Sequence, residues 1–263
     1  SDEIDTNPPR TLSEFSPRFC SSYFALFGDP LLEEDIDPYP DGYLKRLAAS
    51  GVDSIWMHVV LYQLAPFPWD SSMSEHHETR LKRLNALVER ARNRGIGIYL
   101  YMNEPRAMPN AFFKDHPELK GVTIGDHSTL CTNAREVREY ISSSVETICK
   151  VVPNLEGFFT ITASENPTNC WSHNKGAECS RCSIIGPAKT IAGVNSAIQD
   201  GIQRANNDSS LIAWDWGWRD EWALDAIAAL PKEVSLMSVS EWSIPIERGG
   251  VKTQVGEYSI STV

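Results

Sequence analysis

Short, uninterrupted apolar runs alternate along the chain with longer segments in which apolar residues recur at the spacing of a helix. The apolar runs predict parallel β-strands, and the longer segments predict the helices that connect them. The predicted strands cover residues 19–27, 54–61, 96–102, 157–162, 211–214, 234–239 and 257–261. The predicted helices cover residues 42–50, 75–94, 134–151, 187–206 and 221–230.

This alternation of strand and helix predicts an α/β fold, a (β/α)8 TIM-type barrel. The predicted strands are one fewer than a closed barrel contains, so we expect this chain to lack the last strand and helices. An open, doubly wound sheet is the alternative, but no glycine-rich phosphate-binding turn follows a predicted strand. We expect residues 1–17 to form an N-terminal extension and residues 18–263 the barrel domain, within a longer multidomain protein.

The composition is that of a globular protein, and it limits the classes of partner. The chain has 263 residues, of which 41% are hydrophobic and 22% charged, so it is long enough to bury a core. The formal net charge of −11 and the scattered basic residues disfavour nucleic acid as a partner. No apolar run reaches about 18 residues, so we expect no membrane insertion. The chain begins without a signal-peptide pattern, and the localisation stays open.

Acidic residues follow several predicted strands at the carboxyl end, where the active sites of (β/α) barrels lie. These strand-exit carboxylates are Glu104, Glu165, Asp215 and Glu241. Because the carboxyl ends of barrel strands meet at one rim, we expect them to share one mouth with His58 and Arg106.

Glycoside hydrolysis uses two carboxyl groups beside the scissile bond. One protonates the leaving oxygen, and the other acts as nucleophile or base. Glu165 is our candidate for the general acid because it follows an apolar strand. Glu241 is the preferred partner and Asp215 the second choice, and the adjacent Asn166 is a candidate for substrate binding. The sequence gives no distance between the carboxyl groups, so retention and inversion stay open.

The segment Asn103-Glu104-Pro105 matches the Asn-Glu-Pro that many clan A glycosidases carry after their fourth strand, where the Glu is the acid/base. Here it follows the third predicted strand. Either another strand lies upstream of Ser1, or Glu104 and Arg106, with Asn103, hold substrate hydroxyls. We favour the second interpretation.

Tryptophan is frequent, with eight residues in the chain, and it gathers after the fifth and sixth predicted strands. An indole offers a flat apolar face and one donor, which suits sugar rings as well as protein cores. The candidates for substrate binding are Trp216, Trp218 and Trp242. Core packing is the alternative, and we expect it for one or two of Trp214, Trp216 and Trp218.

The spacing Cys170-x2-His173-x5-Cys179-x2-Cys182 is typical of a structural zinc site. The alternatives are free thiols or a disulfide from Cys170 to Cys179 or Cys182, and His173 then has the option of facing the substrate. Either clamp would stiffen the loop that follows Glu165. Cys20, Cys131 and Cys149 lie in or beside apolar segments and are expected to be buried thiols. We expect no cofactor for catalysis.

Five segments of the chain resemble bacterial proteins described as similar to family 20 glycoside hydrolases. The segments are GVDSIWMHVVL, IGIYLYMNEPRAMP, FTITASENPTNCWSH with ECSRC, IAWDWGWRDEW, and MSVSEWSIPIERGGV with GEYSIS. Family 20 hexosaminidases carry an Asp-Glu pair after the fourth strand, and the Asp orients the substrate acetamido group. Here Ser164 precedes Glu165, so the resemblance implies only the acid role of Glu165.

The sequence therefore predicts a glycoside hydrolase that acts on a β-linked or amino-sugar-containing oligo- or polysaccharide. The alternative is a non-catalytic carbohydrate-binding barrel, in which the same tryptophan and acidic residues only hold a glycan.

Overall fold

The computed structural model describes residues 16–238 and 245–254. The predicted strand 257–261 lies outside the described residues, as do Glu241 and Trp242. The chain divides into two compact units. The first unit comprises Ser1–Met102, Arg138–Phe159 and Ala197–Leu211, and the second comprises Asn103–Val137, Thr160–Ser196 and Ile212–Val263.

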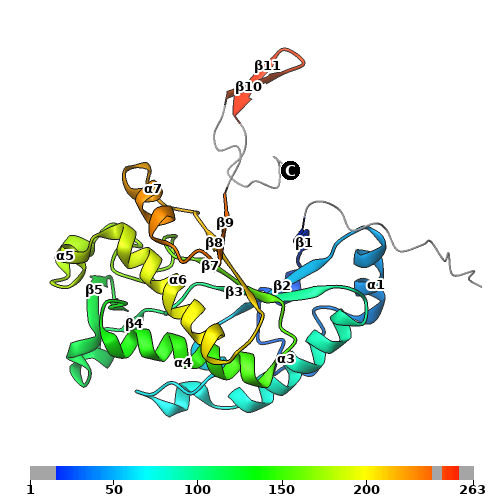
Figure 1. The fold of residues 1–263 in the computed structure, drawn as a ribbon, viewed down its shortest axis with the longest axis horizontal. Helices are drawn as coiled ribbons and strands as arrows, with labels where there is room; N and C mark the ends of the chain where they lie inside the picture. Colours follow the sequence, from blue (N-terminus) through cyan, green and yellow to red (C-terminus); the bar gives the residue numbers. More distant parts are fainter. Residues whose placement is uncertain (1–15, 239–244, 255–263) are drawn as a thin grey trace, which may run out of the picture. The chain divides into compact units, whose positions relative to one another are not determined.

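One six-stranded sheet follows the order of the chain (Figure 1). Its strands, in order, are β1 (Phe19–Cys20), β2 (Ser54–Val59), β3 (Gly97–Met102), β7 (Gly157–Ile161), β8 (Ser210–Trp214) and β9 (Val234–Met237). β1 pairs with β2, and β2 with β3, in parallel register. Neighbouring strands that follow one another and are joined through helices are typical of a parallel (β/α) sheet. The predicted α/β architecture is confirmed.

The five predicted helices are present, and their bounds differ from the predicted ones by at most two residues at either end. They are α1 (Asp41–Ala49), α3 (His77–Arg92), α4 (Arg135–Val151), α6 (Pro187–Arg204) and α7 (Asp220–Ala229). Two further short helices are α2 (Leu61–Leu64) and α5 (Cys182–Ile185). Each helix in the described ranges is too short or too polar to cross a lipid bilayer.

The predicted strand 19–27 is wrong beyond Cys20. Residues Tyr23–Ala25 form a 3-10 helix, because the Ser22 hydroxyl accepts a hydrogen bond from the backbone N–H of Phe24 and caps the turn. The side chains of Tyr23 and Phe24 are exposed. A central strand of a parallel sheet is buried on both faces, so an apolar run that is exposed to water does not continue as such a strand.

Two small antiparallel sheets lie where no strand was predicted. β4 (Met108–Pro109), β5 (Lys120–Ile124) and β6 (His127–Leu130) form a three-stranded sheet in the order β4-β6-β5. β10 (Pro245–Arg248) and β11 (Val251–Gln254) form a hairpin. Gly125 turns the chain between β5 and β6 with a φ of 61°, a left-handed conformation that favours glycine.

Ion pairs fasten the acidic segment after β1, up to the first residue of α1, to helix α3 and its C-terminal end. The pairs are Arg80–Asp29, Arg83–Glu34, Arg90–Asp37 and Arg94–Asp41. The Arg80 pair differs from the others because the side chain of Arg80 is only 10% exposed. Its guanidinium also donates to the backbone carbonyls of Gln63 and Glu75. Arg80 therefore satisfies three acceptors from separate segments of the first unit.

We predict that Arg80→Met lowers the free energy of unfolding by about 2–3 kcal/mol, because it leaves Asp29 and two carbonyls without their donor. The matched control is Arg83→Met, one turn further along α3, whose partner Glu34 is 85% exposed. Arg83 also donates to the backbone carbonyl of Leu32, but it makes one backbone contact where Arg80 makes two, and its ion pair is exposed, so the loss should be about 1 kcal/mol. Urea unfolding of the two variants measures the difference, and equal losses would contradict the assignment.

Candidate functional site

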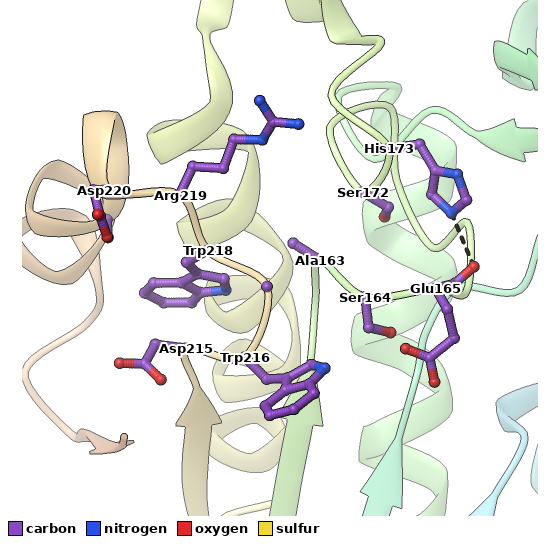
Figure 2. Close-up of a pocket in the computed structure, with 12 residues that line it drawn as sticks. Ala163, Ser164, Glu165, Ser172, His173, Asp215, Trp216, Trp218, Arg219 and Asp220 are labelled. Atoms are coloured by element: carbon purple, nitrogen blue, oxygen red, sulfur yellow. Dashed lines mark hydrogen bonds between the residues drawn. The ribbon is translucent and has the colours of Figure 1, made fainter. Parts of the chain in front are cut away.

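Two consecutive strand exits of the second unit line one cavity of about 890 Å³ (Figure 2). The loop after β7 contributes Ala163, Ser164 and Glu165, and the turn after β8 contributes residues from Asp215 onward. A cavity of this size falls in the range of small-molecule sites, roughly 300–1,000 Å³. Of the strand-exit carboxylates that were expected to share one mouth, Glu165 and Asp215 border this cavity together.

At Gly217 the turn after β8 lies directly against the loop after β7. Its φ is 75°, in the left-handed region, and a methyl group in place of its hydrogen would overlap the carbonyl oxygen of Ala163. A side chain at this position is thus opposed both by backbone conformation and by direct contact. The absent side chain is what lets the Asp215 turn lie against the Glu165 loop.

Trp218 anchors the same turn from below. It is 8% exposed, and its indole N–H donates to the hydroxyl of Thr162 over 3.0 Å. It packs in a core cluster with Trp222, whose ring lies 6.2 Å away. Trp218 is therefore mainly a core residue, although it also borders the cavity.

Trp216 is half-buried and borders the cavity between the two acidic residues. Its ring lies 5.4 Å from that of Trp214 in a tilted arrangement. In the view of Figure 2, the Trp216 indole lies between the side chains of Asp215 and Glu165. An indole in this place offers an apolar face beside two polar groups, which is the combination that sugar rings contact.

The two cavity carboxylates have different surroundings. Glu165 is exposed, and its backbone carbonyl accepts a hydrogen bond of 2.9 Å from Nε2 of His173 (Figure 2). Asp215 is half-buried, and its carboxylate accepts a hydrogen bond from the hydroxyl of Ser238. Figure 2 shows the Asp215 carboxylate turned away from Glu165.

Two polar contacts of the Ser164 hydroxyl lie in the turn that carries Glu165. The backbone N–H of Asn166 donates to the Ser164 hydroxyl over 3.4 Å, and that hydroxyl lies 3.5 Å from Oδ1 of Asn103. Asn103 thus contacts the cavity wall through Ser164. Asn166, which is half-buried, lies in the turn itself.

Glu104 lies among buried groups. Its side chain is 1% exposed, and it accepts a hydrogen bond of 3.1 Å from the backbone N–H of Arg106. The Arg106 guanidinium lies 3.7 Å away and compensates the charge. Neither residue is among the described residues that border the cavity.

His58 belongs to the first unit. It lies within β2 and not after it, and its ring is 5.5 Å from that of Tyr101. It borders a smaller cavity of about 200 Å³ together with Asp29 and Arg80.

Sequence reasoning missed Arg219 and Asp220, which border the large cavity and begin helix α7. The signal was present, because both directly follow the Asp-Trp-Gly-Trp segment at residues 215–218. The cavity also includes Ser172 and His173 from the loop after β7.

Four thiols gather in a second site of the same unit. The cysteine cluster consists of Cys131, Cys170, Cys179 and Cys182, whose sulfur atoms all lie within 4.8 Å of one another. All four are buried and free. Three of the four residues predicted from spacing are in the cluster, whereas His173 contacts Glu165 and Cys131 contributes the fourth sulfur.

The cluster favours negative charge on one sulfur. Hydrogen bonds from the thiols of Cys170 and Cys182, together with Arg181, hold the pKa of Cys131 far below the usual value of a thiol. The same contact with Cys131 raises the pKa of Cys170 and that of Cys182. Donors that converge on a sulfur stabilise its thiolate.

No protein-family model matches the chain, and no curated protein matches it. Several solved structures of glycoside hydrolases share its fold. CpGH89 of Clostridium perfringens, solved with GlcNAc-alpha-1,4-galactose, is 12% identical with a TM-score of 0.56, and the match covers 88% of this chain and 28% of that one.

A GH5-4 broad specificity endoglucanase from an uncultured bacterium is 11% identical with a TM-score of 0.51, and the match covers 78% of this chain and 57% of that one. The Flavobacterium johnsoniae chitobiase FjGH20 is 14% identical with a TM-score of 0.48, over 84% of this chain and 34% of that one. The chain thus spans between 28% and 57% of the length of these three structures. The fold is of the TIM-barrel type found in glycoside hydrolases.

We predict that Gly217→Ala destabilises the protein strongly and disturbs the cavity, because the new methyl group meets the Ala163 carbonyl. The expected loss is about 4 kcal/mol or more in the free energy of unfolding. Thermal or urea unfolding followed by tryptophan fluorescence measures it.

Gly125→Ala is the matched control, since Gly125 also has a positive φ but no heavy atom lies within 4 Å of the position of a Cβ. It carries only the backbone cost, about 1–2 kcal/mol. If both variants lost the same stability, the contact between the two strand exits would not be the reason for glycine at position 217.

Proposed function

We propose that the large cavity binds a sugar unit and that the chain hydrolyses a glycosidic bond of a β-linked or amino-sugar-containing glycan. The observation that carries the proposal is that Glu165 and Asp215, from successive strand exits, border one cavity together with Trp216. Two carboxyl groups and an aromatic face are the minimal set for binding and cleaving a sugar at a barrel rim.

In this proposal Glu165 is the proton donor to the leaving oxygen. Its carboxyl group is exposed at the cavity, and its position is held by the hydrogen bond from His173 to its backbone carbonyl. The exposed carboxyl group is accessible to a substrate oxygen.

Asp215 is the second carboxylate in this mechanism. Ser238 donates to it and fixes its orientation. When it turns toward the anomeric carbon, its charge stabilises the oxocarbenium-like transition state. Whether it attacks the sugar or activates a water is decided by its distance from Glu165 in the complex with substrate.

Three other groups suit the polar edge of a sugar. Arg219, Ser172 and His173 border the cavity and carry N–H or O–H donors for hydroxyl or acetamido oxygens. Trp216 supplies the apolar contact. These contacts orient the sugar, and Glu165 can transfer a proton only to a glycosidic oxygen that is held in the right position.

The fold supports the same proposal. Structures of the same fold include enzymes whose names and ligands are those of glycan hydrolysis, among them the broad specificity endoglucanase and the enzyme with GlcNAc-alpha-1,4-galactose. One fold hosts many chemistries, so it is the residues of the cavity that favour glycoside hydrolysis.

A second candidate function is glycan binding without turnover. It is favoured by the orientation of Asp215, whose carboxylate contacts Ser238 and points away from Glu165 (Figure 2). The two candidates require the same sugar contacts and differ in whether Glu165 transfers a proton. The experiment below separates them.

We predict that Glu165→Gln lowers kcat by about 10²- to 10⁴-fold on natural glycans and leaves glycan binding within a fewfold, because it removes a proton donor and little contact area. A panel of α- and β-linked aryl glycosides and oligosaccharides first identifies a substrate of the unmodified protein. The kcat on aryl glycosides with a strongly acidic leaving group should fall much less, since such a leaving group departs without protonation.

Glu233→Gln is the control, because it makes the same change at an exposed position outside the cavity. It should leave kcat and binding unchanged. Full turnover by Glu165→Gln would exclude Glu165 as the acid. Binding of a glycan without hydrolysis of any substrate by the unmodified protein would favour the second candidate function.

We predict that Trp216→Ala weakens sugar binding by about tenfold or more, because an aromatic contact contributes about 0.5–1.5 kcal/mol beyond the area it buries. Trp216→Phe keeps a ring face and should retain most of the affinity. Calorimetric titration with the glycan identified above gives both values. Unchanged affinity in the Ala variant would show that the indole is not a sugar platform.

A further inference from the structure

The cysteine cluster has the spacing of a tetrahedral metal site. The Sγ atom of Cys131 lies 3.7 Å from that of Cys179 and 3.6 Å from that of Cys182. Zinc bonds to thiolate sulfur at about 2.3 Å, so the sulfurs of a regular tetrahedron lie about 3.8 Å apart. These two sulfur pairs therefore have the separation that one central ion requires, and all four sulfurs lie within 4.8 Å of one another.

We propose that Cys131, Cys170, Cys179 and Cys182 bind one structural zinc ion, with His173 outside the ligand set. Four protein ligands close the coordination sphere, which is typical of structural and not of catalytic zinc. Binding releases the thiol protons and leaves four thiolates around the ion.

The groups around the sulfurs are those of an outer shell for thiolates. Nε of Arg181 donates to Sγ of Cys131 over 3.3 Å, and the amide of Asn133 donates to Sγ of Cys182 over 3.3 Å. Arg181 is itself held by the carbonyl of Glu118 over 2.7 Å. A zinc ion with four thiolates carries a net negative charge, and a fixed guanidinium beside it compensates part of that charge.

The ligands come from three segments of the second unit. Cys131 follows β6, Cys170 lies in the loop after β7, and Cys179 and Cys182 form a Cys-x2-Cys pair at the start of α5. A bound ion therefore links the small antiparallel sheet to the loop that borders the cavity. A metal ion stabilises a folded protein most when its ligands close a long stretch of chain, as those from Cys131 to Cys182 do.

The proposed zinc site affects the cavity through the residues next to Cys170. The side-chain amide of Asn169 donates to the carbonyl of Thr162 over 2.5 Å, and His173 donates to the carbonyl of Glu165. Cys170 lies between these two attachments. The zinc thus holds the loop that carries His173 and Ser172 against the Glu165 turn, without contacting the cavity itself.

A disulfide does not match this arrangement. A disulfide sulfur has one partner at about 2.05 Å, whereas Cys131 has two thiol neighbours at almost equal distance and all four thiols are free. Nearly equal distances from one sulfur to its neighbours are typical of sulfur ligands arranged around one ion.

Elemental analysis of protein purified without chelator tests the proposal. We expect about one zinc per chain, no bound iron, and an intact mass without the loss of hydrogens that a disulfide causes. Metal-free protein, iron in place of zinc, or a disulfide between cluster cysteines would each overturn it. Cobalt exchanged into the site should show the absorption of a tetrahedral thiolate complex, and an octahedral spectrum would contradict the ligand set.

Three variants distinguish the ligands. Cys131→Ser should lose most of the bound zinc and lower the thermal midpoint, while His173→Ala should keep about one zinc per chain. Cys149→Ser is the matched control, because Cys149 is also a buried thiol but lies outside the cluster, and it should keep the metal. If Cys131→Ser does not fold, zinc content and the cobalt spectrum of His173→Ala still decide. Loss of the metal from His173→Ala would overturn the assignment of Cys131 as the fourth ligand.

Discussion

The contact between Gly217 and the carbonyl of Ala163 is the constraint on which the large cavity depends. It brings the turn after β8 against the loop after β7, so that Asp215 and Glu165 border the same space. Trp218 secures the arrangement from the core side through its bond to Thr162. A rigid apolar base below and a polar rim above is the usual way in which barrel folds separate stability from chemistry. Here Gly217 lies where the apolar base meets the polar rim.

The loop after β7 connects the cavity to the cysteine cluster within a few residues. Its first part holds Glu165, its middle holds Cys170, and His173 returns to contact the carbonyl of Glu165. Loops of this length are mobile unless something ties them down. Buried thiols that converge from three segments supply that tie, so the position of the proposed acid rests on a site that makes no contact with substrate.

The sequence predicted the helices and inner strands well because their signal is local. The apolar faces of α3 and α6 recur at helical spacing, and β7 is a short, mainly apolar run that is buried throughout. Contacts set by the whole fold were not predictable in this way. Sequence spacing favoured His173 as a zinc ligand, whereas the fold brings in Cys131, which lies 48 residues before Cys179. The sheet β4-β6-β5 was missed because its strands are short and polar, and the segment after Cys20 was misread because exposed aromatic residues imitate a buried strand.

In the proposed mechanism, the orientation of Asp215 decides how the cavity reaches a catalytic arrangement. Its carboxylate accepts a hydrogen bond from the exposed Ser238, and a solvent-exposed hydrogen bond contributes about 1 kcal/mol. This is no more than a sugar offers when several of its hydroxyls bind, so substrate binding is sufficient to exchange the Ser238 contact for one to the sugar. Asp215 is half-buried and borders the cavity beside Trp216, and a charge partly shielded from water acts more strongly than one in bulk water. A carboxylate held aside by one weak contact, next to an aromatic face, therefore fits the proposed site, in which the catalytic arrangement forms when a glycan binds.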